Sequence, residues 1–294
     1  MTIHSILICG GTHGNELSGV YAVRQWKQNS QKLQQLAPSA NISFELVNKA
    51  SVDARTRFID EDLNRQFDLR KLQAKRAEDG SSHEATLAQS LNEQYGPKPH
   101  GNIDLIVDIH NTTSAMGPTL IVLENDHFNQ QLARYVKTHM PDAVILVEDH
   151  IPYEQHPYFC TLGKRSVMVE VGPQAQGALR ADIYLQTLRM TELIVAFIET
   201  VNTNTDEQLP PVEAYRLIAE IPYPTDSLGQ RSAMNHPNID GNDFTEVRAG
   251  MPCFMDFEGK DILWEGDTVY PHFVGEAAYD KQNLAFATAQ KCEF

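Results

Sequence analysis

Short apolar runs alternate with stretches of helical periodicity over the first 200 positions. After Ile6-Leu7-Ile8, the apolar runs bounded by turn residues lie at 43–48, 103–110, 118–124, 142–149 and 166–172. Near-continuous apolar strands are typical of a sheet that is covered on both faces. Helical patterns fall between these runs, at 16–36, 82–95, 127–139 and 181–202. The alternation predicts an α/β domain with a mainly parallel sheet flanked by helices.

The pattern changes after an Asn/Thr/Pro-rich stretch at 201–213, which we interpret as a linker. Beyond it come "AYRLIAEIPY", "MPCFMDFEG", "DILWEGDTVY" and "HFVGEAAYDK", which are short β-type runs with Gly and Asp turns. We therefore predict two domains, an α/β domain over residues 1–206 and a smaller C-terminal β domain over residues 209–294.

Composition and charge exclude several classes of protein. The 294 residues carry a formal net charge of −15, which argues against a nucleic-acid-binding protein because such proteins need a basic face. The four cysteines are scattered without a CxxC pair, as expected for reduced thiols. No apolar stretch approaches the ~18 residues of a membrane span, and the N-terminus does not resemble a signal peptide. A cytoplasmic protein without membrane partners is expected.

A glycine turn follows the first apolar run, in "ILICGGTHGNELSG". A strand, a glycine turn and a helix are the setting in which open α/β sheets bind ligands. His13 and Glu16 lie there three positions apart, so on a first helical turn both side chains would face the same way. His110 ends the run "IDLIVDIH" and would reach the same edge of a parallel sheet.

Two imidazoles and one carboxylate form a ligand set that proteins use for catalytic zinc, with a fourth position left for water. Asp108 stands two residues before His110, points to the same face of the strand, and would orient that ligand from behind. Alone, an H-x-x-E spacing is common by chance, and a histidine at a strand end is usually only solvated. The common placement of the three residues at strand ends favours a metal site.

Two further segments add chemistry. "ARTRFIDEDLNRQF" carries Arg57, Asn64 and Arg65, which by default would be solvated loop residues. "VEVGPQAQGALRAD" places Glu170 within an otherwise apolar strand. A carboxylate in such a run is costly unless it is paired or lies near a metal, although on an edge strand Glu170 could also face solvent.

Five segments together resemble the aspartoacylase family of zinc-dependent N-acyl-amino-acid deacylases, from about residue 8 to about residue 285. They read "GGTHGNELSG", "RFIDEDLNRQF", "DIHNTTSAMG", "EVGPQAQGALRAD" and "VGEAAYDK". The resemblance implies a zinc-carboxypeptidase-like fold, a C-terminal β domain that caps the active site, and one Zn²⁺ per subunit. It also suggests a homo-oligomer.

Residue by residue, the resemblance implies the following roles. His13, Glu16 and His110 would be the zinc ligands, Glu170 the general acid/base, and Arg57 the group that polarises the scissile carbonyl. The α-carboxylate of the substrate would be bound by Asn64 and Arg65, with Tyr279 of the C-terminal domain nearby. Tyr158 would be a further substrate-binding residue, in the stretch that binds the side-chain carboxylate in such enzymes.

The implied reaction is hydrolysis of N-acetyl-L-aspartate to acetate and L-aspartate. One departure concerns the arginine that binds the side-chain carboxylate in such enzymes. Cys160 or Leu162 stands where that arginine is expected, and Lys164 or Arg165 would have to replace it. The alternatives are therefore a broader N-acyl-amino-acid deacylase that accepts aromatic or other side chains, and a succinylglutamate desuccinylase.

Other activities agree less well with the sequence. A carboxypeptidase needs room for a polypeptide, which a capping β domain would not leave. A non-catalytic binder of acidic metabolites would have no use for Glu170 as a base. A phosphate-binding loop is excluded because the glycine turn matches neither G-x-x-x-x-G-K-[ST] nor G-x-G-x-x-G.

Overall fold

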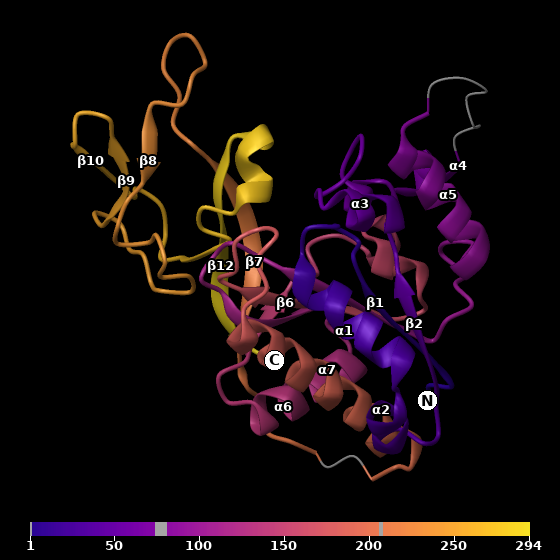
Figure 1. Cartoon of the computed structure of the whole chain (residues 1–294). Helices are drawn as coiled ribbons and strands as arrows, with labels where there is room; N and C mark the ends of the chain where they lie inside the picture. Colours follow the sequence, from indigo (N-terminus) through magenta and orange to yellow (C-terminus); the bar gives the residue numbers. More distant parts are fainter. Residues whose placement is uncertain (1, 74–80, 206–207) are drawn as a thin grey trace.

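One large sheet runs through the whole molecule in the computed structural model, which describes residues 2–73, 81–205 and 208–294. Its strand order is β11-β12-β7-β5-β4-β6-β3-β1-β2. Figure 1 labels β12, β7, β6, β1 and β2 of this sheet. The strands are β1 (Ser5–Gly10), β2 (Asn41–Leu46), β3 (Leu105–Asn111), β4 (Gly117–Val122), β5 (Val144–Val147), β6 (Ser166–Gly172), β7 (Glu213–Pro222), β11 (Tyr270–His272) and β12 (Leu284–Glu293).

The strands that carry the predicted site run in the same direction. β2, β1, β3 and β6 are parallel neighbours, so the ends of β1, β3 and β6 lie at one edge. β4 runs antiparallel to β6 and is followed by parallel β5 and β7, after which β12 and β11 pair antiparallel. The predicted α/β architecture with a mainly parallel sheet is confirmed, and the direction reverses at β4, at β12 and at β11.

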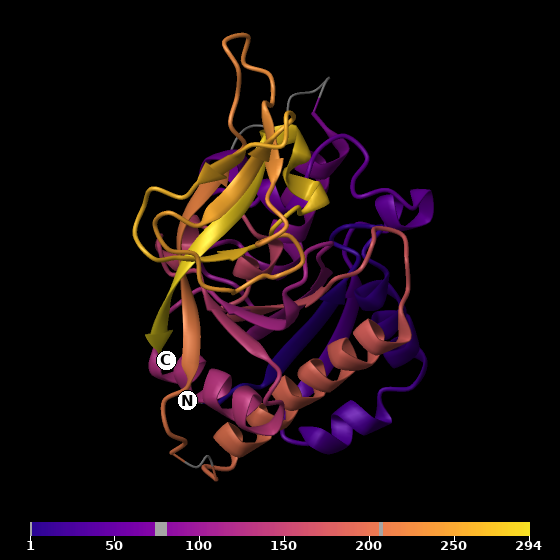
Figure 2. The same cartoon turned by 90° about the vertical axis from the view of Figure 1, so that its left-hand side faces the viewer.

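Helices cover both faces of this sheet. The helices are α1 (Leu17–Gln28), α2 (Gln31–Leu36), α3 (Lys49–Ala54), α4 (Leu69–Gln73), α5 (His83–Tyr95), α6 (His127–His139) and α7 (Ala181–Asn202). α1, α2, α6 and α7 gather on one face, where side chains such as Trp26, Leu132 and Met190 share a core with the sheet (Figures 1 and 2). α5 packs on the opposite face through Ala88 and Leu91. Within the described ranges, no helix is both long and apolar enough to cross a bilayer.

The C-terminal part of the chain forms two structures. β7, β11 and β12 extend the large sheet, whereas β8 (Ala233–Asn235), β9 (Pro252–Asp256) and β10 (Asp261–Leu263) form a separate three-stranded sheet. The smaller sheet has its own core and lies beyond the end of the large one (Figure 1). A C-terminal β domain is thus present, but it is joined to the α/β part through backbone hydrogen bonds between β5 and β7. The predicted boundary at residue 206 falls at 206–207, outside the described residues.

One predicted helix is divided. The sequence pattern suggested a single helix over 16–36, but α1 ends at Gln28 and α2 begins at Gln31. Asn29 between them is extended, and its side-chain oxygen accepts a hydrogen bond from the Gln31 backbone N–H. Asn and Ser compete in this way with the helical backbone, which explains the break.

Candidate active site

The three predicted metal ligands meet at one point. His13 and Glu16 lie in the turn between β1 and α1, and His110 lies on β3. Glu16 Oε1 is 2.8 Å from His13 Nδ1, and Glu16 Oε2 is 2.9 Å from His110 Nδ1. One ligand atom from each residue lies within 4.8 Å of the others, and all three side chains are buried. The turn geometry differs from the prediction, because α1 begins only at Leu17 and Glu16 caps it.

The donor set fits a metal ion. His13 Nδ1 is buried and has no hydrogen-bond partner with suitable geometry among the described residues, although it faces the Glu16 carboxylate. Two imidazole nitrogens and a carboxylate are ligands that zinc accepts. An ion placed among them would give His13 Nδ1 the partner that it lacks. These three residues could therefore hold a divalent metal.

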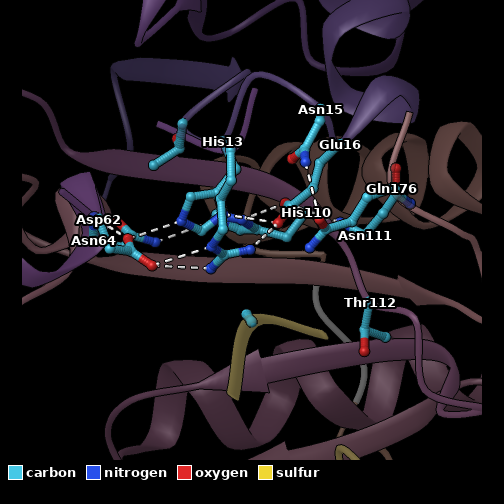
Figure 3. A network of polar contacts seen from close by, with 12 residues as sticks. His13, Asn15, Glu16, Asp62, Asn64, His110, Asn111, Thr112 and Gln176 are labelled. Atoms are coloured by element: carbon cyan, nitrogen blue, oxygen red, sulfur yellow. Dashed lines mark hydrogen bonds and ion pairs between the residues drawn. The ribbon is translucent and has the colours of Figure 1, made fainter. Parts of the chain in front are cut away.

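A carboxylate lies close to the far ring nitrogen of each histidine, and Figure 3 shows Asp62 beside His13. His13 Nε2 is 2.9 Å from Asp62 Oδ1, and His110 Nε2 is 3.0 Å from Asp108 Oδ2. Thr12 Oγ1 donates to Asp108 Oδ1 at 2.8 Å. A carboxylate behind a ligating imidazole fixes the ring and its tautomer. The sequence predicted this contact for Asp108 but missed Asp62, which stands in the acidic run "IDEDLN" without a distinguishing signal.

Arg57 joins the same network. Its Nη1 donates to Glu16 Oε1 at 2.8 Å, and its Nε and Nη2 donate to Asp62 Oδ2 at 3.2 and 3.0 Å. The loop that carries Arg57 is held by the buried Glu84, whose carboxylate accepts the backbone N–H groups of residues 59, 60 and 61. Arg57 is thereby fixed beside the metal-ligand cluster.

Glu170 lies opposite His110 in the register of β6 and β3 and lines the same cavity. Directly opposed residues of neighbouring strands place their side chains close together. Burial, opposed in part by His110, raises the pKa of the Glu170 carboxyl well above its usual range. The carboxyl is therefore placed to exchange a proton next to the metal-ligand cluster.

A second group of predicted residues lies on two adjoining segments. Asn64 belongs to the 3₁₀ helix η1 (Leu63–Arg65), and its Oδ1 accepts the backbone N–H of Phe159 at 2.9 Å. The Arg65 guanidinium lies 5.8 Å from the centre of the Tyr158 ring, and Tyr158 immediately precedes η3 (Phe159–Leu162). The structure therefore brings Asn64, Arg65 and Tyr158 together along one wall of the cavity.

The cavity has a volume of about 390 Å³ and joins these two groups. Tyr279, from the C-terminal part of the chain, lines it together with Arg57, Arg65 and Glu170. Tyr279 lies in η4 (Ala277–Gln282), which begins after the buried Glu276. Glu276 accepts hydrogen bonds from the Thr112 and Thr113 hydroxyls and from the Thr113 backbone N–H. This contact fixes the C-terminal segment against the residues that follow His110. No pattern in the sequence predicts it.

Lys164 is not brought to the cavity. Its ammonium pairs with Asp104 at 2.8 Å and its side chain is 57% exposed. The Arg165 guanidinium pairs with Asp126. Cys160 and Leu162 are fully buried in the core around Phe159. The arrangement therefore does not support Lys164 as a substrate ligand, because its position after the turn points it outward.

Comparisons with known proteins give the same picture over the whole chain. Residues 2–198 match the succinylglutamate desuccinylase/aspartoacylase catalytic domain, and residues 210–291 match the AstE/AspA barrel-sandwich hybrid domain. Mus musculus aspartoacylase is 38% identical, covering 98% of this chain and 93% of its own. The Homo sapiens N-acyl-aromatic-L-amino acid amidohydrolase (carboxylate-forming) is 35% identical, covering 99% and 92%. The crystal structure of murine aminoacylase 3 superimposes with a TM-score of 0.92 at 34% identity, covering 100% and 97%.

Proposed function

Because the chain belongs to the succinylglutamate desuccinylase/aspartoacylase family, we propose that it is a zinc-dependent amidohydrolase that deacylates N-acyl-L-amino acids. One observation carries this proposal: the His13–Glu16–His110 cluster opens into the cavity that also contains Glu170 and Arg65. When bound by these three residues, zinc would supply Lewis-acid activation of a water molecule and of the amide carbonyl.

Glu170 would act as the general base and then as the general acid. It would accept a proton from the attacking water as the C–O bond forms and deliver it to the leaving amine as the C–N bond breaks. Burial raises the pKa of its carboxyl above the usual range, which favours the return of the proton to the leaving amine. The products are a carboxylate and a free amino acid.

Arg57 and Arg65 would bind two different groups of the substrate, the reacting carbonyl oxygen and the α-carboxylate. Arg57 lies against Glu16 and would stabilise the negative charge that develops on the carbonyl oxygen. Arg65 would bind the α-carboxylate with its planar fork of N–H donors, helped by Asn64, Tyr158 and Tyr279. A substrate held at both ends in this way is a small acyl amino acid.

The choice of amino-acid side chain is the finer part of the proposal. N-acetyl-L-aspartate is the substrate that the sequence predicts, and N-acyl aromatic amino acids are the main alternative. The relatives named for these two activities are about equally similar to this chain. N-acetyl-L-aspartate carries a second carboxylate, for which Lys164 does not line the cavity.

A substrate panel tests the proposed function. Zinc-loaded protein would be assayed for release of free amine from N-acetyl-L-aspartate, N-acetyl-L-tyrosine, N-acetyl-L-leucine and N-succinyl-L-glutamate. We expect hydrolysis of at least one of these N-acetyl amino acids. The corresponding α-amides, which lack the α-carboxylate for Arg65 and are assayed in parallel, should not be hydrolysed. Equal rates for acids and amides would contradict the assignment of Arg65, and absence of hydrolysis throughout would contradict the proposed function.

A further inference from the structure

Few cations face the cavity. Among the residues that line it, the permanently charged cations are Arg57 and Arg65. Arg57 is already paired with Glu16 and Asp62. If Arg65 binds the α-carboxylate of the substrate, no described lining residue with a fixed positive charge remains for a second carboxylate. The described lining of the cavity therefore offers a second carboxylate no fixed positive charge of its own.

Two further carboxyl groups line the cavity. Glu148 follows β5, and its backbone N–H donates to Val122 O at 2.9 Å, which continues the pairing with β4. Glu220 lies on β7, and both residues line the cavity. Burial is the main cause that raises the pKa of Glu148 and of Tyr279; Glu220 adds to the rise for Glu148, and both carboxyls add to the rise for Tyr279.

Glu148 is buried, and only one of its two carboxylate oxygens accepts a hydrogen bond from a described residue. Its side chain is 6% exposed, and its Oε2 accepts a hydrogen bond from the Tyr158 hydroxyl at 3.2 Å. Its Oε1 has no hydrogen-bond donor among the described residues. Burial raises the pKa of Glu148 to about 7, although the Tyr158 hydroxyl and the Arg65 guanidinium both act to lower it. An oxygen that has no protein donor can accept a hydrogen bond from a ligand in the cavity.

A second polar group on the same wall also lacks a partner. His272 on β11 lies opposite Ala287 on β12, which in turn lies opposite Glu220 on β7. All three line the cavity. His272 is fully buried, and neither of its ring nitrogens has a hydrogen-bond partner among the described residues. Burial lowers its pKa to about 4, so the ring is neutral and adds no positive charge.

We infer that Glu148 determines the side-chain specificity of this enzyme, selecting N-acyl amino acids whose side chain ends in an N–H donor, above all an ammonium, over those that end in a carboxylate. The inference rests on the proposed function and specifies its substrate class. An ammonium would bind the free Oε1 of Glu148 and be attracted by Glu220. A carboxylate in the same place would face two like charges, and such a juxtaposition costs several kcal/mol.

A purely structural role for Glu148 makes a different prediction. If its carboxylate only held Tyr158 in place, its replacement would affect all substrates alike, because every N-acyl amino acid carries the same α-carboxylate. Selection of the side chain, in contrast, changes the ratio of kcat/KM between substrates. The ratio therefore distinguishes the two roles.

The test uses three substrates of nearly equal size: N-acetyl-L-aspartate, N-acetyl-L-asparagine and N-acetyl-L-2,4-diaminobutyrate, assayed at pH 8 with the zinc-loaded full chain. For the unmodified protein we expect kcat/KM for the diaminobutyrate to exceed that for the aspartate by about tenfold or more, with the asparagine between them. Glu148→Gln should reduce this ratio by about tenfold. Glu213→Gln is the matched control, because Glu213 is an exposed β7 carboxylate paired with Lys291 outside the cavity lining, and it should leave the ratio unchanged.

Each outcome decides the inference. A preference of the unmodified protein for aspartate, or an unchanged ratio in a folded Glu148→Gln variant, would overturn it while leaving the proposed function intact. If Glu148→Gln does not fold, Glu220→Gln is used instead, because Glu220 is exposed. We expect this variant to reduce the ratio of kcat/KM in the same direction but by less. An unchanged ratio would count against the inference. If none of the three substrates nor any in the broader panel is hydrolysed, the proposed function fails, and the inference fails with it.

Discussion

At the scale of single residues, the roles of the cavity carboxylates follow from what each one contacts. Glu16 faces both histidines, whereas Glu170 lies on the neighbouring strand opposite His110 and outside the cluster of three ligands. A carboxylate that adjoins a metal site without belonging to it is available for proton transfer. Glu170 should therefore be dispensable for metal binding but not for turnover.

Glu170→Gln tests this separation. The amide keeps the shape of the carboxylate but cannot accept and return a proton, so we expect kcat to fall by roughly 10²–10⁴-fold. Zinc content, measured by atomic absorption on the purified variant, should remain at one per chain. A rate close to that of the unmodified protein would show that another group is the base.

Asp62→Asn tests the contact behind His13. The amide would no longer hold the imidazole as a charged acceptor, so zinc affinity should fall by roughly 10–100-fold in a competition titration with a chromogenic chelator. Asp53→Asn provides the control, since Asp53 forms an exposed ion pair with Lys49. If Asp62→Asn bound zinc as tightly as Asp53→Asn, Asp62 would not support the metal site.

The sequence predicted the ligand residues better than their surroundings. His13, Glu16 and His110 could be found because a glycine turn and a strand end marked their positions. Asp62 and Glu148 stand among other acidic residues, and only the folded chain shows which carboxylate faces inward. Lys164 could not be placed for the same reason, because a lysine after a turn has the same local pattern whether it faces the cavity or solvent.

At the scale of elements, the segment between α3 and η1 owes its shape to a single buried carboxylate. Glu84, in the first turn of α5, accepts Asn48 Nδ2 at 2.9 Å in addition to the three backbone N–H groups of residues 59–61. Burial opposes ionisation, but these donors together hold the pKa of Glu84 below its usual value. The loop that carries Arg57 and Asp62 is thus held by an ionised group.

Glu84→Gln should lower the free energy of unfolding by about 1–3 kcal/mol at pH 7, because an amide cannot satisfy several donors at once. A carboxyl whose pKa is lowered by folding stabilises the protein above its unfolded pKa of ~4.3 and loses that contribution as pH falls through the folded value. The difference in the free energy of unfolding between Glu84→Gln and the unmodified protein should therefore shrink below about pH 4. Urea denaturation at several pH values measures it, with the exposed Glu265→Gln as control. A difference that is constant with pH would contradict the role of the charge.

Predicted elements agreed with the structure where periodicity was strong and the ends were marked. The helices predicted at 127–139 and 181–202 and the strand at 166–172 have these bounds in the structure. The helix predicted at 16–36 failed at Asn29, where a local side-chain hydrogen bond competes with the helix. The short α3 and α4 carry too few turns for a periodic signal, so the sequence did not predict them.

At the scale of the whole molecule, the cavity is completed by segments that are far apart in the chain. Its wall combines the turn after β1, the loop before η1, β6, and the C-terminal η4 with Tyr279. Glu276 fixes η4 to Thr112 and Thr113, so the distant C-terminal segment is placed by contacts next to His110. The sequence predicted a separate C-terminal domain but not that its strands extend the central sheet, because strand pairing between β5 and β7 leaves no local pattern.

The dependence of turnover on a metal held by His13, Glu16 and His110 is the most direct test of the proposed function. The protein would be dialysed against a chelator, and the rate on its best N-acetyl amino acid followed while zinc is added back. We predict that the metal-free protein is inactive and that the rate returns in proportion to added zinc, saturating at one equivalent per chain. Full turnover by metal-free protein would contradict the proposal.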